Sequence, residues 1–365
     1  MMDGAACRYR RFLIAFLTVV ALSVAGMATF NYVVDPFQYY RVAKLYRPIL
    51  WGGMQRYQNA GLARNFAEDT VIVGSSVTEN FLPSDLRALW GAPATKLSIS
   101  GSTAHEQFLV LRAALRTGRV RNVFWGLDTG AFYSAPAAVR DDQAPYPWHM
   151  YREGPVPNIE YLLALGTSRL SIAALKGYGE TDFDAYHAWH DKFEFGPAVT
   201  IKAWGGTCDS FKEKYAIGGA PLPVALAEKR EQSIRENLVE LIRTHPEVRF
   251  HLFLPPLATL IYVPAATRLL PVHLPFRERV AEDVLGFANV RLFDFQADRS
   301  ISDDLSRFKD PLHFDLMTTR QIITSIRDDL HRVRSVAEMA DNNRKLIDIA
   351  NAYDLCAGGR SLPNQ

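Results

Sequence analysis

The sequence has almost no net charge. Its 41 Lys and Arg residues stand against 39 Asp and Glu residues, which leaves a formal net charge of +2 over 365 residues. A balance this small, with the charges dispersed along the chain, gives no argument for nucleic-acid binding or for a basic membrane patch. The sequence also shows no internal repeat and no low-complexity tract.

Long apolar runs are equally scarce. Residues 12–34 form a run long enough to cross a bilayer, and Arg8, Arg10 and Arg11 precede it. A cleaved signal peptide is one alternative, because Ser23 and Ala25 are small residues at the spacing of a cleavage site. The run continues well past the roughly 7 to 15 residues of a cleavable core, which favours a retained anchor. Basic residues flank both ends of the run, so their number does not decide its orientation. The short tail and the large remainder favour an extracytoplasmic body.

Cysteine is rare, with three residues in the chain. Cys7 would lie on the cytoplasmic side of the anchor, which leaves Cys208 and Cys356 in the body. Two thiols permit one disulfide bond in an oxidising compartment, and two buried free thiols are an equally good interpretation.

What the sequence has in quantity is apolar residues, at 48% of the chain, which is ample for a large core. Short β-branched or alternating runs alternate with helical patterns. Five strands are expected, at residues 71–73, 95–100, 122–127, 248–254 and 290–295. Helices are expected at residues 84–90, 226–244, 274–285, 316–333 and 345–353. The pattern predicts an α/β fold with a doubly wound, flavodoxin-like parallel sheet.

The same pattern gives domain boundaries. Residues 1–34 are the tail and anchor, 35–65 a connector, 66–335 the main domain and 336–365 a helical tail. Residues 131–222 break the alternation after strand three, so they are expected to be an insertion. The insertion is rich in aromatic residues, which can stack on sugar rings but more often form a small core of their own.

A candidate nucleophile follows the first strand. The apolar run stops at Gly74, and Ser75 and Ser76 come next, at the place where a parallel sheet delivers side chains to ligands. A single serine here is commonly only a turn residue. However, Asp310 and His313 lie three residues apart after the last strand. Serine catalysis needs a base and a group that orients the base, and these residues supply both.

These two blocks resemble those of the SGNH (GDSL-like) hydrolase superfamily, in which a Gly-x-Ser block follows the first strand and an Asp-x-x-His block comes late. The similarity covers about residues 66–330. It is closest to the membrane-anchored branch that contains the alginate acetylation proteins and the D-alanyl transfer protein of teichoic acids. The resemblance implies a catalytic triad of Ser76, His313 and Asp310 and no metal or organic cofactor.

The resemblance also implies a place and a substrate. The protein would be a single-pass protein of the inner membrane with a periplasmic body, acting as an esterase or O-acyltransferase on an exported or envelope polysaccharide. A membrane-bound O-acyltransferase would be its partner. Whether water or a sugar hydroxyl accepts the acyl group is left open by the sequence.

Two further positions bear on the oxyanion hole. Gly101 precedes a helix that begins with a capping box of Thr103 and Glu106. In the family a glycine here donates its backbone N–H to the oxyanion, although a glycine that only permits a turn is the alternative. The family's next block carries an asparagine donor, whereas this chain has Asp128. An ionised carboxylate cannot donate, so the hole would depend on the N–H groups of Ser76 and Gly101.

Other polar clusters are given less weight. Residues 182–191 contain the side-chain types that bind metals but no recognised metal spacing, so a polar helix face is the preferred interpretation. His251 lies within a strand and His273 precedes a helix, so neither is expected to be catalytic. The second functional hypothesis is a catalytically weak or inactive envelope assembly protein that binds glycan, which Asp128 favours and the intact triad disfavours.

Overall fold

A computed structural model of the chain describes residues 2–142, 144–152, 154, 158–205, 224–262 and 270–353. The chain divides into two compact units. The first combines Met1–Phe66 with Pro147–Asp182, and the second combines Ala67–Tyr146 with Phe183–Gln365. The first unit therefore joins the expected anchor and connector to part of the expected insertion. Cys208 and Cys356 lie outside the described residues, so the disulfide bond stays a prediction.

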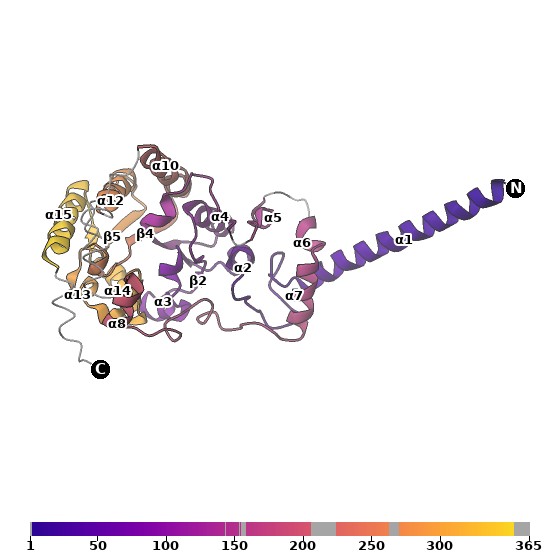
Figure 1. The fold of residues 1–365 in the computed structure, drawn as a ribbon, viewed down its shortest axis with the longest axis horizontal. Helices are drawn as coiled ribbons and strands as arrows, with labels where there is room; N and C mark the ends of the chain where they lie inside the picture. Colours follow the sequence, from indigo (N-terminus) through magenta and orange to yellow (C-terminus); the bar gives the residue numbers. More distant parts are fainter. Residues whose placement is uncertain are drawn as a thin grey trace. The chain divides into compact units, whose positions relative to one another are not determined.

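The first unit is built on one long helix, α1 (Met2–Val34), drawn in indigo in Figure 1. Within the described residues its section Cys7–Val34 is the one helix long and apolar enough to cross a membrane. The shorter helices α6 (Ile159–Leu162) and α7 (Leu165–Leu175) pack against α1. The unit also contains α2 (Gln55–Gly61), a π-helical turn η1 (Leu62–Phe66) and α5 (Trp148–Tyr151).

The second unit is organised around a mostly parallel sheet. Its strands run in the order β2-β1-β3-β4-β5-β8, with all neighbours parallel except β5 and β8. Their bounds are β1 Thr70–Val73, β2 Ala94–Lys96, β3 Asn122–Gly126, β4 Arg249–Leu254, β5 Val290–Asp294 and β8 Arg332–Val333. The central strands β1, β3 and β4 are buried except at the first residues of β3 and β4, Asn122 and Arg249, as their mostly apolar sequences require.

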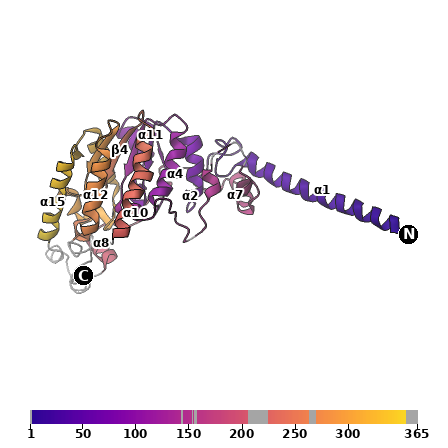
Figure 2. The same ribbon diagram turned by 90° about the horizontal axis from the view of Figure 1, so that it is seen from above.

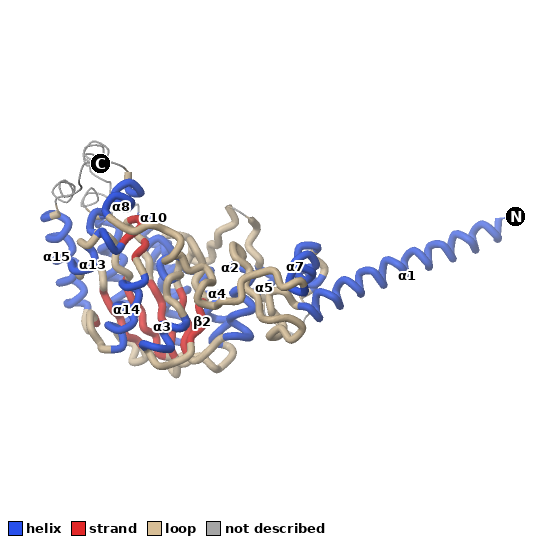
Figure 3. The backbone as a smooth tube through the Cα atoms, turned by 90° about the horizontal axis from the view of Figure 1, so that it is seen from below, coloured by secondary structure: helices blue, strands red, loops and turns tan. Residues whose placement is uncertain are grey.

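Helices cover both faces of this sheet. Figure 2 shows α4, α10, α11, α12 and α15 over one face, and Figure 3 shows α3 and α14 over the other. Their bounds are α3 Pro83–Leu89, α4 Ala104–Leu115, α10 Val224–Ile234, α11 Glu240–Thr244, α12 Leu270–Val284, α14 Leu316–Arg327 and α15 Val336–Ala352. Two shorter helices are α8 (Pro197–Trp204) and α13 (Arg299–Ser302). Ile72, Phe124 and Phe293 are fully buried within the core between the sheet and α14.

The sheet has six strands instead of the expected five. The helix expected to reach residue 333 ends at Arg327, because Asp329 and His331 adopt left-handed backbone conformations with φ of 58° and 60°. The chain then turns back, and β8 pairs antiparallel with β5.

Three other expectations differ from the structure. The helix expected at residues 226–244 is interrupted by a π-helical turn, η4 (Arg235–Val239), between α10 and α11. The helix expected at residues 345–353 begins earlier, at Val336, and buries Met339 and Leu346. Residues 182–191 form turns and contain no helix, so the interpretation of this segment as a polar helix face was wrong.

Candidate active site

Ser76 begins a short 3₁₀ turn, η2 (Ser76–Thr78), directly after β1. The turn requires glycine at position 74, where φ is +153° and an added Cβ would lie 2.6 Å from Thr78 Cγ2. The Thr78 hydroxyl donates to the Ser75 carbonyl at 2.9 Å and is hydrogen-bonded to the Ser98 hydroxyl at 2.6 Å. These contacts hold the Ser76 side chain at the carboxyl end of β1.

Asp310 and His313 are brought together by a hairpin. Asp310 ends β6 (Phe308–Asp310) and faces His313, which begins β7 (His313–Phe314). The carboxylate Oδ1 accepts hydrogen bonds from the backbone N–H groups of Leu312 at 2.9 Å and His313 at 3.0 Å. The three-residue spacing in the sequence is therefore the span of one tight turn.

Ser76, His313 and Asp310 form one hydrogen-bonded chain. His313 Nε2 lies 2.8 Å from Ser76 Oγ, and His313 Nδ1 lies 2.8 Å and 2.7 Å from the two carboxylate oxygens of Asp310. Burial alone would raise the pKa of Asp310, but its hydrogen bond with His313 and the nearby backbone N–H groups hold that pKa well below its usual range. An ionised Asp310 fixes the tautomer in which Nδ1 carries the proton and Nε2 can accept one from Ser76.

Sequence reasoning missed Trp189, which contacts both His313 and Ser76. Its ring meets the His313 ring edge-on, with centroids 5.4 Å apart and an interplanar angle of 86°, and its indole N–H lies 3.4 Å from the Ser76 carbonyl oxygen. Asn80 holds it there by accepting from the backbone N–H groups of Trp189 at 3.0 Å and His190 at 3.1 Å. Trp189 lies in a segment without periodicity, so the sequence offered no signal for it.

Lys309 was also missed. Its Nζ lies 3.1 Å from Asp310 Oδ2, over the ring of Trp189 at 5.0 Å and over the ring of Phe193 at 4.4 Å. The side chain is largely buried, at 15% relative exposure, so the ammonium group acts on the carboxylate with little screening by solvent. The adjacency of Lys309 to the Asp-x-x-His block is visible in the sequence.

Gly101 lies beside the same turn. Ile99 donates its backbone N–H to the Gly74 carbonyl at 3.0 Å, which fixes the segment before Gly101 against the turn after β1. Gly101 has a φ of +57°, and an added Cβ would collide with the Arg140 guanidinium group. The expected capping box of Thr103 and Glu106 is formed at the start of α4. Gly101 therefore meets the turn requirement, and its role as an oxyanion donor stays a prediction.

Asp128 follows β3 and caps the 3₁₀ turn η3 (Thr129–Phe132). Its Oδ1 accepts from the Ala131 N–H at 3.0 Å, whereas its buried Oδ2 has no hydrogen-bond partner among the described residues. Burial raises the pKa of Asp128, although the nearby Ser75 hydroxyl, the Ala131 N–H and the charge of His313 oppose this rise. The capping role is thus present, and the carboxyl group also interacts electrostatically with His313.

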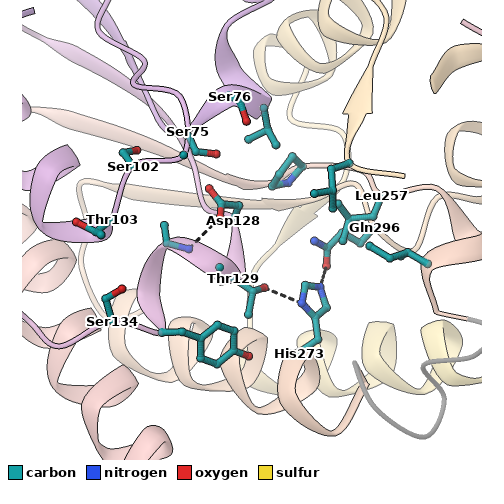
Figure 4. Close-up of a pocket in the computed structure, with 18 of the residues that line it drawn as sticks. Ser75, Ser76, Ser102, Thr103, Asp128, Thr129, Ser134, Leu257, His273 and Gln296 are labelled. Carbon is teal, nitrogen blue, oxygen red and sulfur yellow. Dashed lines mark hydrogen bonds between the residues drawn. The ribbon is translucent and has the colours of Figure 1, made fainter. Parts of the chain in front are cut away.

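A cavity of about 540 Å³, shown in Figure 4, lies beside Ser76. Ser75, Ser76, Gly101 and Asp128 line it, and most of the remaining lining is apolar. Other lining residues are Arg140, Trp204, Pro255, Leu257, Ile261 and Leu312. The cavity is large enough for an ester substrate to place its carbonyl group against Ser76.

One polar group in this lining is His273, which lies inside α12 and not before it. Its Nδ1 is 2.6 Å from Thr129 Oγ1 and its Nε2 is 2.8 Å from Gln296 Oε1, so both ring nitrogens are occupied. Burial lowers the pKa of His273 to about 4, which keeps the ring neutral near pH 7. Among the described residues, no group of three or more His, Cys, Asp or Glu side chains is arranged to hold a metal ion.

Comparisons with known proteins add little to this geometry. No family model and no curated protein match the chain. A solved structure from Streptococcus pneumonia, described provisionally as a platelet activating factor, is similar at 12% identity and a TM-score of 0.38, over 75% of this chain and 90% of that one. A similarity this low supports no conclusion about activity.

Proposed function

We propose that the protein is a membrane-anchored serine esterase or O-acyltransferase of SGNH type. The observation that carries the proposal is the hydrogen-bonded chain of Ser76, His313 and Asp310 at the edge of the sheet. The order of the parallel strands supports it, since 2-1-3-4-5 is a doubly wound order with its ligand site at the carboxyl ends of the strands.

The chemistry follows from the positions of the three side chains. Ser76 Oγ attacks an ester carbonyl while His313 Nε2 takes the hydroxyl proton, and Asp310 orients the ring through Nδ1. The N–H groups of Ser76 and Gly101 stabilise the oxyanion. His313 then gives its proton to the leaving alcohol, which leaves an acyl-serine ester. Water or a second hydroxyl releases the acyl group by the reverse sequence of proton transfers.

The proposed place of this reaction is the extracytoplasmic side of the inner membrane, with α1 as a retained single-pass anchor. The proposed substrate is an acylated envelope or exported polysaccharide, and a membrane-bound O-acyltransferase is the proposed partner. Support for these assignments comes from the length and hydropathy of α1 and from the resemblance of the Gly74 to Ser76 and Asp310 to His313 blocks to the membrane-anchored branch of the family.

The test uses the full chain in detergent micelles. A fluorophosphonate probe should label the wild type and Ser75→Ala but not Ser76→Ala, and His313→Ala should label much more slowly. Ser75→Ala is the matched control because Ser75 lines the same cavity without contacting His313. Equal labelling of Ser76→Ala and the wild type would refute the assignment.

A second candidate function is a glycan-binding assembly protein with little or no turnover. Asp128 favours it, because a buried carboxyl group stands where the family has an amide donor. The two functions differ in one readout. A probe that labels no serine in a folded wild-type protein, together with measurable polysaccharide binding, would support the assembly role.

A further inference from the structure

Helix α7 in the first unit has an unusual distribution of side chains. It buries Thr167, Ser171 and Ala174, which are small or polar, and exposes Leu165, Ile172 and Leu175, which are large and apolar. The exposed fractions of these three are 69%, 48% and 48%. A helix on the surface of a water-soluble domain does the opposite and turns its apolar stripe towards the core. This arrangement indicates that something other than water covers the outer face of α7.

The buried face of α7 packs against the end of α1. The Asn31 side-chain amide donates to the Leu162 carbonyl at 2.8 Å and to Ser168 Oγ at 2.9 Å, and Ser171 Oγ donates to Asn31 Oδ1 at 3.1 Å. Figure 1 shows α6 and α7 beside this end of α1. Small residues and side-chain hydrogen bonds are what join helices at membrane depth, because they allow close approach without an aqueous hydrophobic effect.

The length of α1 places this contact near a membrane surface. A bilayer core needs about 20 helical residues. Counted from Phe12, which follows the basic residues at one end, about 20 residues reach Asn31 and Tyr32. Tyr32 is 46% exposed, and the Arg41 guanidinium group lies over its ring at 4.2 Å. A tyrosine paired with an arginine at this level is typical of the membrane–water interface.

The outer face of α7 also carries positive charge. Arg169 and Lys176 are exposed and follow Leu165 and Ile172 by four residues each, so they lie on the same side of the helix. Leucine and isoleucine bordered by basic residues are the composition of helices that lie in the headgroup region, where long basic side chains reach anionic phosphates.

We infer that the outer face of α7 docks into the headgroup region of the bilayer that α1 crosses, with anionic phospholipid as its partner. This inference rests on the membrane anchor of the proposed function and is independent of the chemistry at Ser76. It would hold the first unit against the lipid surface at the end of the anchor. A protein partner covering the same face is the competing occupant.

The experiment places one fluorescent label on the full chain. Cys7, Cys208 and Cys356 are replaced by serine, and NBD is attached at Ile172→Cys in vesicles of equal parts phosphatidylethanolamine and phosphatidylglycerol. Lipids that carry a doxyl group near the headgroup should quench this label strongly, and aqueous iodide should quench it weakly. Leu330→Cys is the matched control, because Leu330 is an apolar residue of the second unit with 54% exposure. It should show the reverse pattern.

A label at Leu22→Cys, within the proposed anchor, separates the two ways of failing. If doxyl groups deep in the bilayer do not quench it, the anchor itself is wrong. If they do, and the Ile172→Cys label is quenched by iodide but not by lipid, the docking inference is overturned. Shielding of Ile172→Cys from both quenchers would also overturn it, because protein and not lipid would then cover the face.

Discussion

Asp128→Asn is the perturbation that most sharply tests how this site stabilises an oxyanion. Asparagine keeps an acceptor for the Ala131 N–H, so the cap of η3 should survive. The change replaces the buried Oδ2, which has no hydrogen-bond partner among the described residues, by an amide N–H₂ group. It therefore removes a charge and adds two donors without a large change in shape.

The magnitude follows from the position of the carboxyl group beside Ser75, the residue that precedes the nucleophile. Two like charges about 5 to 7 Å apart repel by about 2 to 3 kcal/mol at an effective dielectric constant of about 20. Removing that repulsion should raise the acylation rate by about thirty- to two-hundredfold when Asp128 is ionised. Because burial raises the pKa of Asp128, the wild type loses this charge as pH falls. The variant's advantage should therefore shrink towards low pH and grow towards high pH.

The assay is hydrolysis of p-nitrophenyl acetate by the wild type and Asp128→Asn between about pH 5 and pH 9. The readout is the ratio of the two kcat/KM values at each pH. Asp304→Asn is the matched control, because Asp304 also caps a short 3₁₀ turn, η6 (Leu305–Arg307), through a backbone N–H. A ratio that stays near one at every pH, with an unchanged melting temperature, would show that the carboxyl group only caps η3.

Three further outcomes are expected. Lys309→Met removes the ammonium group beside Asp310, so the carboxylate should stabilise the protonated form of the site more strongly. The pH below which kcat/KM falls should therefore rise by up to about one unit. Lys309→Arg keeps the positive charge and should leave this pH unchanged. Gly74→Ala should lower stability by about 1 to 3 kcal/mol and slow acylation, as seen in thermal unfolding and probe labelling, because a Cβ at this positive φ meets Thr78. In the folded protein the pKa of His273 is about 4, whereas in the unfolded chain the ring takes a proton below about pH 6.5. The free energy of unfolding should therefore fall as the pH is lowered from about 6.5 to about 4. In His273→Asn this free energy should fall by about 2 kcal/mol less between pH 6.5 and pH 5, as measured by chemical denaturation.

The sequence allowed the convergence of Ser76, Asp310 and His313 to be predicted because local chemistry marks each of them. Gly74 indicates a turn that residues with a side chain form only with strain. The spacing of Asp310 and His313 matches the span of one hairpin. Each signal lies within a few residues, and the first also follows a strand that its apolar run reveals. Trp189 lacks such a signal. Its place depends on Asn80, more than a hundred residues earlier, and a pairing of that separation leaves no periodicity to read.

The first unit shows the same limit on a larger scale. Residues 35–65 read as a connector and residues 131–222 as one insertion, because neither has the alternation of an α/β sheet. The structure instead joins the connector to the middle of the insertion through single contacts between distant side chains, such as the 2.8 Å hydrogen bond from the Tyr161 hydroxyl to Asp35. Burial raises the pKa of Asp35, because the charged carboxylate is less favourable away from water. A chain begun near residue 60 would lose Asp35 and α1 together, and Tyr161 would remain without its partner. Helix α1 and the segment at 147–182 therefore belong to one compact unit, and removing α1 would also remove the helix against which α6 and α7 pack.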